Sequence, residues 1–300
     1  MTSAPLSSRR LSPFEPLVEQ IESLSALDAP GKAIGKRVRG ALDRGALKDA
    51  LSGTQLGHAL HPMLTDVVIG SFLSASLLDL LGGGENDGAS ERLIAVGIAA
   101  YGPTALTGVN DWADTEPADD GVRRVGLVHA AVNSAALALY TASLVARRRG
   151  SRRKGAVLGA VGAAVLGAAG YLGGHLTLAK GVGPDQTVYD PGPRDWTPAA
   201  ESSALTEGQP TRVVVDDTPV LLVRRGARVL AIHDRCSHRG CSLSDGDVEG
   251  EQIVCACHGS RFDLADGSVR HGPATAPQPA FEVRDQDGFI AIRLLAPSSN

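Results

Sequence analysis

The chain has 300 residues, with 29 basic and 33 acidic side chains and a formal net charge of −4 at pH 7. Such a weak negative charge supplies no excess of cations to pair with phosphate groups, so a nucleic-acid partner is not expected. The apolar residues concentrate between residues 62 and 179, and hydrophilic stretches flank them on both sides.

Residues 1–57 form a hydrophilic segment in which two helices are predicted. Ser12-Pro13-Phe14-Glu15 matches a Ser-x-x-Glu capping box with proline at the first helical position. Apolar side chains then recur at helical spacing, at Phe14, Leu17, Val18, Ile21 and Leu24. This stripe predicts an amphipathic helix that lies on the membrane surface or on a helical bundle. Pro30-Gly31 would separate it from a second, basic helix over residues 32–50.

Four apolar stretches separated by short polar turns follow in residues 58–180. Residues 126–146 carry no charge over 21 positions and residues 155–179 none over 25, so each can cross a bilayer core. Residues 93–109 and residues 63–81, which include Asp66 and Asp79, are weaker candidates. We predict a bundle of four transmembrane helices with membrane lipid as its partner. A soluble bundle rich in alanine and glycine is the alternative.

The last apolar stretch has small residues at four-residue spacing. These are Gly155, Gly159, Ala163 and Gly167. Small side chains at this spacing let helix backbones approach closely in lipid. The pattern therefore favours the membrane bundle over the soluble one.

Residues at both ends of this region carry a family resemblance. Gly57-His58-Ala59-Leu60-His61-Pro62, Asp66 and Ile69-Gly70 lie near its start, and Tyr171-Leu172-Gly173-Gly174-His175-Leu176 lies near its end. In these residues the region 45–180 resembles a bacterial four-helix membrane family of unknown function. The resemblance implies a topology but no activity.

Loop charges predict the orientation in the cell membrane. Four spans return the chain to its starting side, so the N-terminal segment and the C-terminal region share one face. Loop 147–154, on the opposite face, carries six basic residues, whereas loop 112–125 carries two with four acids. The positive-inside rule places the arginine-rich loop in the cytoplasm and the C-terminal region outside it. The eight basic residues of segment 1–57 favour the reverse orientation.

Three histidines are predicted at one depth of the bundle. His61 begins the first span, His129 lies three residues into the third, and His175 lies four residues from the end of the fourth. At about 1.5 Å per residue, all three fall within about a turn of one face. Ionisable groups inside a membrane bundle are functional candidates. The alternatives are a haem b site, a pocket for a quinone head group, and a structural role in which His129 and His175 make interhelical hydrogen bonds and His61 is an interfacial cap.

The region after the bundle begins with a predicted linker and continues with predicted strands. Residues 181–203 hold four prolines and three glycines, which predicts a tether that lets the following region move. Residues 204–296 contain β-branched or aliphatic runs separated by Gly, Asp or Pro turns. The runs are residues 212–215, 220–224, 229–233, 281–284 and 289–294.

All four cysteines of the chain lie in two short boxes of this region. The boxes read Cys236-Ser237-His238-Arg239-Gly240-Cys241 and Cys255-Ala256-Cys257-His258-Gly259-Ser260. A Rieske centre takes two thiolates on one iron and two imidazoles on the other. Cys236 with His238 and Cys255 with His258 provide that set, one Cys and one His from each box. A Cys/His zinc site is the alternative, because zinc binds the same donor types.

In these boxes and their flanks, residues 205–295 resemble the Rieske iron–sulfur proteins of cytochrome bc complexes. The resemblance implies a small all-β sandwich with one [2Fe–2S] cluster and a disulfide between Cys241 and Cys257. It also implies cluster contacts from Ser260 and from a proline loop, Gly272-Pro273-Ala274. Members of the four-helix membrane family are found fused to such domains.

Two departures from the bc-complex pattern bear on function. Arg239 stands where the family usually has a leucine facing the quinol site, which puts direct quinol oxidation in doubt. Phe262 stands where the family usually has a tyrosine whose hydroxyl bonds a ligand sulfur. Since hydrogen bonds to the sulfurs raise the potential, a less oxidising cluster is expected, with Ser260 as a donor that is kept.

The predicted fold class is α + β multidomain, with an N-terminal four-helix transmembrane bundle followed by a small all-β Rieske sandwich over residues 204–296. The predicted function is membrane-anchored transfer of single electrons between a membrane-associated donor and a redox partner, neither of which the sequence identifies. The alternatives are a redox sensor or assembly module, and a subunit of a quinone- or haem-linked oxidoreductase. A Rieske oxygenase is not expected, because its mononuclear iron needs two histidines and a carboxylate, and His271 is the one histidine after His258.

Overall fold

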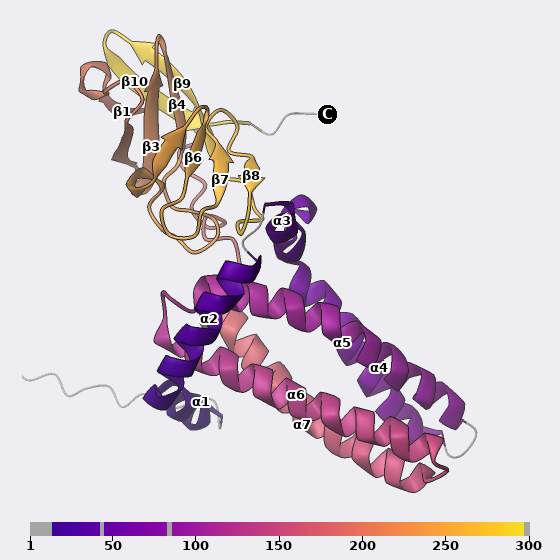
Figure 1. Ribbon diagram of the computed structural model, residues 1–300. Coiled ribbons are helices and arrows are strands. Elements are labelled where there is room, and N and C mark those ends of the chain that lie inside the picture. Colours follow the sequence, from indigo (N-terminus) through magenta and orange to yellow (C-terminus); the bar gives the residue numbers. More distant parts are fainter. Residues whose placement is uncertain (1–13, 43–44, 83–85, 297–300) are drawn as a thin grey trace, which may run out of the picture. The chain divides into compact units, whose positions relative to one another are not determined.

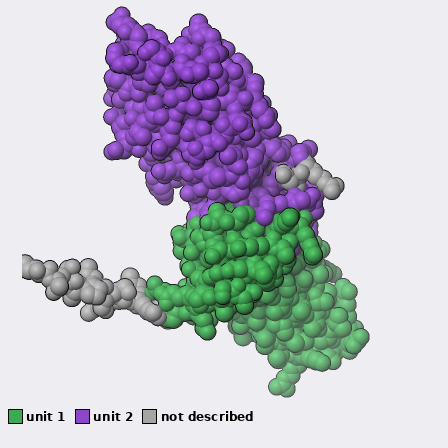
Figure 2. All heavy atoms as spheres, turned by 60° about the vertical axis from the view of Figure 1, so that its left-hand side comes forward, with its two compact units in different colours: residues 1–37, 68–101, 115–180 green, residues 38–67, 102–114, 181–300 purple. Residues whose placement is uncertain are grey.

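The computed structural model describes residues 14–42, 45–82 and 86–296 and consists of two compact units (Figures 1 and 2). Unit 1 comprises Met1–Arg37, Val68–Tyr101 and Thr115–Lys180, and unit 2 comprises Val38–Val67, Gly102–Asp114 and Gly181–Asn300. Ser12 and Pro13 of the predicted capping box lie outside the described residues.

Four long apolar helices confirm the four predicted spans. They are α4 (Leu60–Leu81), α5 (Asp87–Thr115), α6 (Asp120–Arg148) and α7 (Arg152–Leu178), and each is long and apolar enough to cross a membrane. In unit 1 their core surrounds the stacked rings of Phe72 and Tyr140, whose centroids are 4.0 Å apart. The Tyr140 hydroxyl donates to the Phe72 carbonyl at 3.1 Å, which satisfies the one polar atom of that ring pair.

Small residues of α7 allow α6 to approach it closely. A Cβ placed on Gly162 would lie 3.0 Å from the Tyr140 ring, and one on Gly173 would lie 2.9 Å from His129. Gly155 and Gly159 are buried as predicted, but Gly167 is exposed. The contact face follows the 3.6-residue turn of the helix, so a strict four-residue spacing drifts off it.

Buried ion pairs close one end of the bundle. The Arg147 side chain at the end of α6 is 1% exposed and pairs with Asp79 of α4 and, at 2.8 Å, with Asp87 of α5. A buried guanidinium requires such partners because an uncompensated charge costs several kcal/mol, on the order of 3–5. Asp79, which weakened the prediction of the first span, is therefore the counter-ion of this arginine.

The N-terminal segment folds into short helices. They are α1 (Glu15–Glu22), η1 (Ser25–Leu27), α2 (Asp28–Leu42), α3 (Ala46–Ser52) and η2 (Thr54–Leu56). In unit 1 the apolar stripe of α1 packs Val18 and Ile21 against Val125 and Leu172, so it lies on the bundle. The predicted break at Pro30-Gly31 is wrong.

The reason for that error is the position of the proline. Pro30 lies in the first turn of α2, where a missing backbone N–H leaves no helical hydrogen bond unmade. Gly31 also lies inside α2. A glycine is needed there because a Cβ would lie 2.7 Å from the Arg123 side chain of α6. The chain turns instead at η1.

Residues 197–296 of unit 2, here called the head, contain two antiparallel sheets (Figure 1). The larger sheet has the order β1-β10-β9-β4-β3-β2, and the smaller one has the order β5-β6-β7-β8. The strands are β1 (Thr197–Glu201), β2 (Pro210–Val215), β3 (Thr218–Arg225), β4 (Arg228–His233), β5 (Asp247–Glu249), β6 (Gln252–Val254), β7 (Arg261–Asp263), β8 (Val269–His271), β9 (Ala280–Gln286) and β10 (Phe289–Leu294). Two further turns of 3-10 helix are η4 (Ser202–Ala204) and η5 (Leu243–Asp245).

All five predicted strands are confirmed, as β2, β3, β4, β9 and β10. They are the long ones, with six to eight residues each. The four strands of the smaller sheet have three residues each, which is too short for an alternating pattern to be recognised.

Residues 181–203, predicted as a linker, are bonded to the head along most of their length. The backbone N–H of Gln186 donates to the Ser237 carbonyl at 3.0 Å, and the backbone N–H of Leu294 donates to the Pro193 carbonyl at 2.6 Å. Residues 197–201 form β1, which pairs with β10. Residues 181–203, here called the strap, therefore run along the head and are not a free tether. Their content of proline and glycine alone does not distinguish these two cases.

Candidate metal centre

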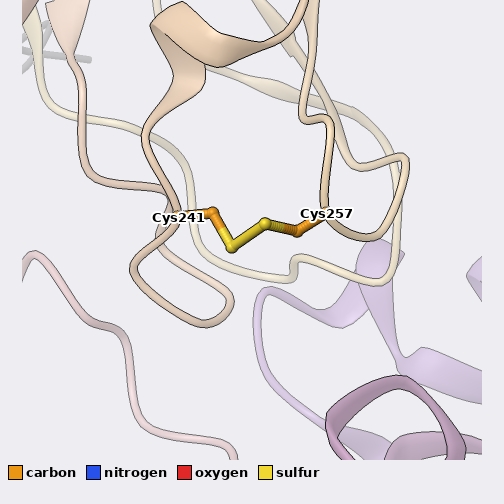
Figure 3. The surroundings of a disulfide bond; sticks show 2 residues. All are labelled: Cys241 and Cys257. Carbon is orange, nitrogen blue, oxygen red and sulfur yellow. A yellow bond between two sulfur atoms is a disulfide. The ribbon is translucent and has the colours of Figure 1, made fainter. Parts of the chain in front are cut away.

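Two loops of the head carry the four cysteines. Residues 236–241 follow β4, and residues 255–260 connect β6 to β7. A disulfide between Cys241 and Cys257 joins the two loops (Figure 3). This pairing confirms the one that the family resemblance implied, and it leaves Cys236 and Cys255 as free thiols.

The two loops have the same backbone turn. The Gly240 amide donates to the Cys236 carbonyl at 2.8 Å, and the Gly259 amide donates to the Cys255 carbonyl at 2.9 Å. The φ angles of the two glycines are 76° and 75°, a left-handed conformation that favours glycine. Each box therefore holds its first cysteine in the same way, and the glycine in each is a requirement of the turn.

The two free thiols lie together in the interior of the head. Cys236 and Cys255 are each 1% exposed and belong to the apolar core between the sheets. A hydrogen bond from Cys236 lowers the pKa of the Cys255 thiol to about 6, and the same bond together with burial raises the pKa of Cys236. One thiolate of the pair is thus formed near neutral pH, which prepares it to bind a metal.

The two histidines, one from each loop, lie close together with their rings nearly perpendicular. Their ring centroids are 5.0 Å apart, and the ring planes meet at 88°. Burial, followed by the positive charges of His258 and Arg239, lowers the pKa of His238 to about 3. Burial and Arg239 lower the pKa of His258 to about 4. Both imidazoles are therefore neutral at pH 7, the state in which a histidine binds a metal.

One ring nitrogen in this group lacks a hydrogen-bond partner. Nδ1 of His238 is buried and, among the described residues, no donor or acceptor reaches it. A buried polar atom without a partner costs about 1–3 kcal/mol, so such an atom calls for a ligand. Two buried thiols and two neutral imidazoles, one with an unsatisfied nitrogen, fit the thiolate and imidazole ligation of a [2Fe–2S] cluster.

A third loop packs against the second cysteine loop. Gly272, Pro273 and Ala274 are buried, and the Ala274 amide donates to Oγ of the fully buried Ser260 at 3.0 Å. The Ser260 carbonyl in turn accepts from the Cys255 amide at 2.8 Å. Ser260 therefore connects the proline loop to a cysteine of the candidate centre, a contact beyond the sulfur bond that the sequence suggested.

The two departures from the bc-complex pattern have different surroundings. Phe262 is fully buried in the core between the sheets and offers no hydrogen-bond donor to a sulfur. Arg239, which stands where the family usually has a leucine facing the quinol site, donates from Nη1 to the Gly181 carbonyl at 2.8 Å. Its guanidinium thus binds the strap that leads into the head.

Sequence reasoning missed Asp234, which supports the first cysteine loop. The carboxylate is almost fully buried and accepts hydrogen bonds from the Ser242 hydroxyl at 2.5 Å and the Ser244 amide at 2.8 Å. Arg212 pairs with it at 3.1 Å. The sequence did contain a signal for this contact: Asp234 lies two residues before the first box, and Ser242 and Ser244 follow the box. Short polar side chains at such positions commonly close a loop by hydrogen bonds.

The three histidines of the membrane domain each have a protein partner. Nδ1 of His129 lies 2.9 Å from the Ala169 carbonyl of α7, and Nδ1 of His61 lies 2.9 Å from the Thr104 carbonyl of α5. Nε2 of His175 lies 3.0 Å from the Glu22 carboxylate of α1. For His129 and His175 these are the interhelical hydrogen bonds that the sequence left open as an alternative, and His61, which that alternative made an interfacial cap, also contacts a neighbouring helix. The haem and quinone hypotheses gain no support from them.

Two known families match this chain, one in the membrane domain and one in the head. The profile of the Rieske [2Fe–2S] domain matches residues 195–282, and the profile of a predicted membrane protein family, DUF2231, matches residues 57–186. The two matches do not overlap. They agree with the two regions that the boxes and the apolar stretches predicted.

Individual relatives match the head. The anthranilate 1,2-dioxygenase ferredoxin subunit of Burkholderia cepacia is 30% identical over 33% of this chain and 93% of its own length. Ferredoxin CarAc of Metapseudomonas resinovorans is 32% identical over 32% of this chain and 92% of its own length. The cytochrome b6-f complex iron-sulfur subunit 2 of Nostoc sp. is 34% identical over 32% of this chain and 56% of its own length.

Proposed function

Because this chain belongs through its head to the Rieske [2Fe–2S] family and carries a DUF2231 membrane domain, we propose that it is a membrane-anchored carrier of single electrons. The observation that carries the proposal is the pair of matched loops with two buried thiols and two neutral imidazoles that lie close together. Four apolar helices support the anchoring to a membrane.

Four side chains would hold the cluster in this proposal. Cys236 and Cys255 would bind one iron as thiolates, and His238 and His258 would bind the other through ring nitrogens, with the unsatisfied Nδ1 of His238 as the clearest ligand atom. A bound [2Fe–2S] cluster supplies reversible uptake of one electron. The disulfide between Cys241 and Cys257 and the apolar core hold the loops in place.

The surroundings of the site should set a moderate potential. Phe262 cannot donate to a sulfur, whereas Ser260, the last residue of the second cysteine loop, keeps a hydroxyl group. Fewer hydrogen bonds to the sulfurs lower the potential. We therefore expect a lower midpoint potential than that of relatives with a tyrosine at the position of Phe262.

The head is proposed to lie outside the cytoplasm. Residues 147–154, which span the end of α6, the connecting turn and the start of α7, include six basic residues, and positively charged segments at the ends of membrane helices are retained in the cytoplasm. The disulfide supports the same orientation, because disulfides persist in oxidising compartments. Protease treatment of intact spheroplasts should remove the head from the cell surface, and protection of the head until lysis would contradict this orientation.

The experiment that tests the function is spectroscopy of the full chain purified in detergent. Reduction by dithionite should produce a Rieske-type EPR signal that integrates to about one electron per chain. A protein with zinc and no iron would overturn the proposal in favour of the zinc alternative. A cluster that exchanges no electrons with isolated membranes of the source cells would favour a sensor instead of a carrier.

A further inference from the structure

Helix α3 and the turn η2, here called the clasp (residues 46–56), make polar contacts with the proline loop within unit 2. Oδ1 of Asp49 accepts from the Gly272 amide at 2.7 Å and lies 2.8 Å from Nδ1 of His271. The Thr54 hydroxyl donates to the Ala274 carbonyl at 3.4 Å. The clasp thus bonds to the same loop that packs against the second cysteine loop.

The proline loop is shaped for this contact at Gly272. A Cβ on Gly272 would lie 2.5 Å from Oγ1 of Thr54 and 3.4 Å from Oδ1 of Asp49. Gly272 is not among the residues with positive φ, so its backbone conformation does not call for glycine. The close approach of the clasp is the physical reason for a glycine at this position.

Helix α3 is also bonded to α5. Lys48 is 4% exposed, pairs with Asp114, and donates to Oδ1 of Asn110 at 2.9 Å. The Asn110 side-chain amide donates to the Ser52 hydroxyl at 3.1 Å. Consecutive residues of one short helix, Lys48 and Asp49, therefore bind α5 and the proline loop, so the helix cannot move without breaking buried polar contacts.

Three hydrogen bonds, joined by short stretches of the chain, connect the clasp to a proposed cluster ligand. Asp49 accepts from Gly272, Ala274 of the same loop donates to Ser260, and Ser260 accepts from the amide of Cys255. We propose that Asp49 is a positioning residue for the iron–sulfur centre: by holding the proline loop it sets the solvent exposure and the midpoint potential of the cluster. This inference rests on the proposed function.

Two substitutions separate the charge of Asp49 from its hydrogen bond. In Asp49→Asn the side-chain oxygen can still accept from Gly272, while the negative charge beside His271 is lost. Because a nearby negative charge favours the oxidised cluster, this variant should raise the potential, with a change of about threefold to tenfold in the reduced-to-oxidised ratio at fixed potential. A tenfold change in that ratio is 59 mV for one electron.

Asp49→Ala removes the charge and the acceptor together. Hydrogen exchange of the full chain should then be about tenfold faster or more in the peptide that contains Gly272 and Ala274, since a charge-assisted bond is lost. Thr54→Val, which keeps the side-chain shape, should give a smaller acceleration and serves if Asp49→Ala does not fold. Asp247→Asn, an equal charge change at an exposed position of β5, is the matched control.

The outcomes distinguish this inference from the function on which it rests. If Asp49→Ala and Thr54→Val both match Asp247→Asn in exchange, and Asp49→Asn matches it in potential, the positioning role of Asp49 is overturned while the cluster assignment stands. If the unsubstituted protein lacks a Rieske EPR signal, the proposed function fails. The role of Asp49 in positioning a cluster then fails with it, whatever the exchange rates show.

Discussion

The histidines of the head and those of the membrane domain differ in what their buried nitrogens contact. His238 keeps Nδ1 buried with no partner among the described residues, in a loop whose first residue, Cys236, is a free thiol. His129 and His61 each direct Nδ1 to a backbone carbonyl of a neighbouring helix. Burial is common to both regions, so burial alone does not mark a ligand. An unsatisfied nitrogen in a loop that also carries a free, buried thiol is the stronger indication.

The difference also shows that a motif with fixed spacing predicts a ligand better than a shared depth in a membrane bundle does. The head histidines belong to boxes in which the family pattern gives each Cys, His and Gly a role. The bundle histidines, in contrast, were grouped because their predicted depths coincided. A membrane interior makes any polar side chain look functional, since it must find a partner there. The partner can simply be a helix carbonyl.

The largest expected effect comes from removing a head ligand. Cys236→Ser, Cys255→Ser or His238→Ala should abolish the Rieske EPR signal, because each iron needs both of its ligands from the protein. His58→Ala, at an exposed histidine, is the matched control and should leave the signal unchanged. A full signal in any of the three ligand variants would break the comparison between the two regions.

Breaking the disulfide should have the next largest effect. Replacing Cys241 and Cys257 together by serine should lower the free energy of unfolding of the head by about 2–5 kcal/mol, because the bridge restrains two loops with little regular structure. Thermal unfolding under non-reducing conditions measures the loss. Free thiols at both positions in the native protein would show instead that the bridge does not form in the cell.

Removing a bundle histidine should cost stability and nothing else. His129→Ala leaves the Ala169 carbonyl without the histidine as partner, which should lower the midpoint of thermal unfolding by the equivalent of about 1–3 kcal/mol. The EPR signal and its rate of appearance should be unchanged. A Soret band in the unsubstituted protein that disappears in this variant would instead place a haem in the bundle.

The smallest expected effect is the pH dependence of the potential. Oxidation adds positive charge to the cluster, and this charge should lower the pKa of the outer ring N–H of both ligand histidines. The oxidised form then loses protons at lower pH than the reduced form, so the midpoint potential should fall as pH rises, by up to about 59 mV per proton and pH unit. Voltammetry from pH 6 to pH 11 checks it, and a flat profile would contradict ligation by two imidazoles that each keep an outer ring N–H.

The boxes and the long apolar stretches determined much of this protein from sequence. Cys236, His238, Cys255 and His258 lie in two loops with the same turn because glycine at Gly240 and Gly259 permits it, and such turns are local. The four spans are equally local, since a helix in lipid satisfies its own backbone and needs only an apolar run of sufficient length. The five long strands followed from short-range patterns in the same way.

Only the tertiary structure decided which polar residues are paired. Asp79 is the counter-ion of Arg147, 68 residues away, and Asp49 binds the amide of Gly272, 223 residues away. Nothing next to Asp49 in the chain indicates this contact, because a hydrogen bond between distant segments depends on where the fold brings them. The sequence alone therefore supplied the proposed ligand set and the four apolar spans, and the structure decided that the bundle histidines have protein partners and that the clasp bonds to the proline loop.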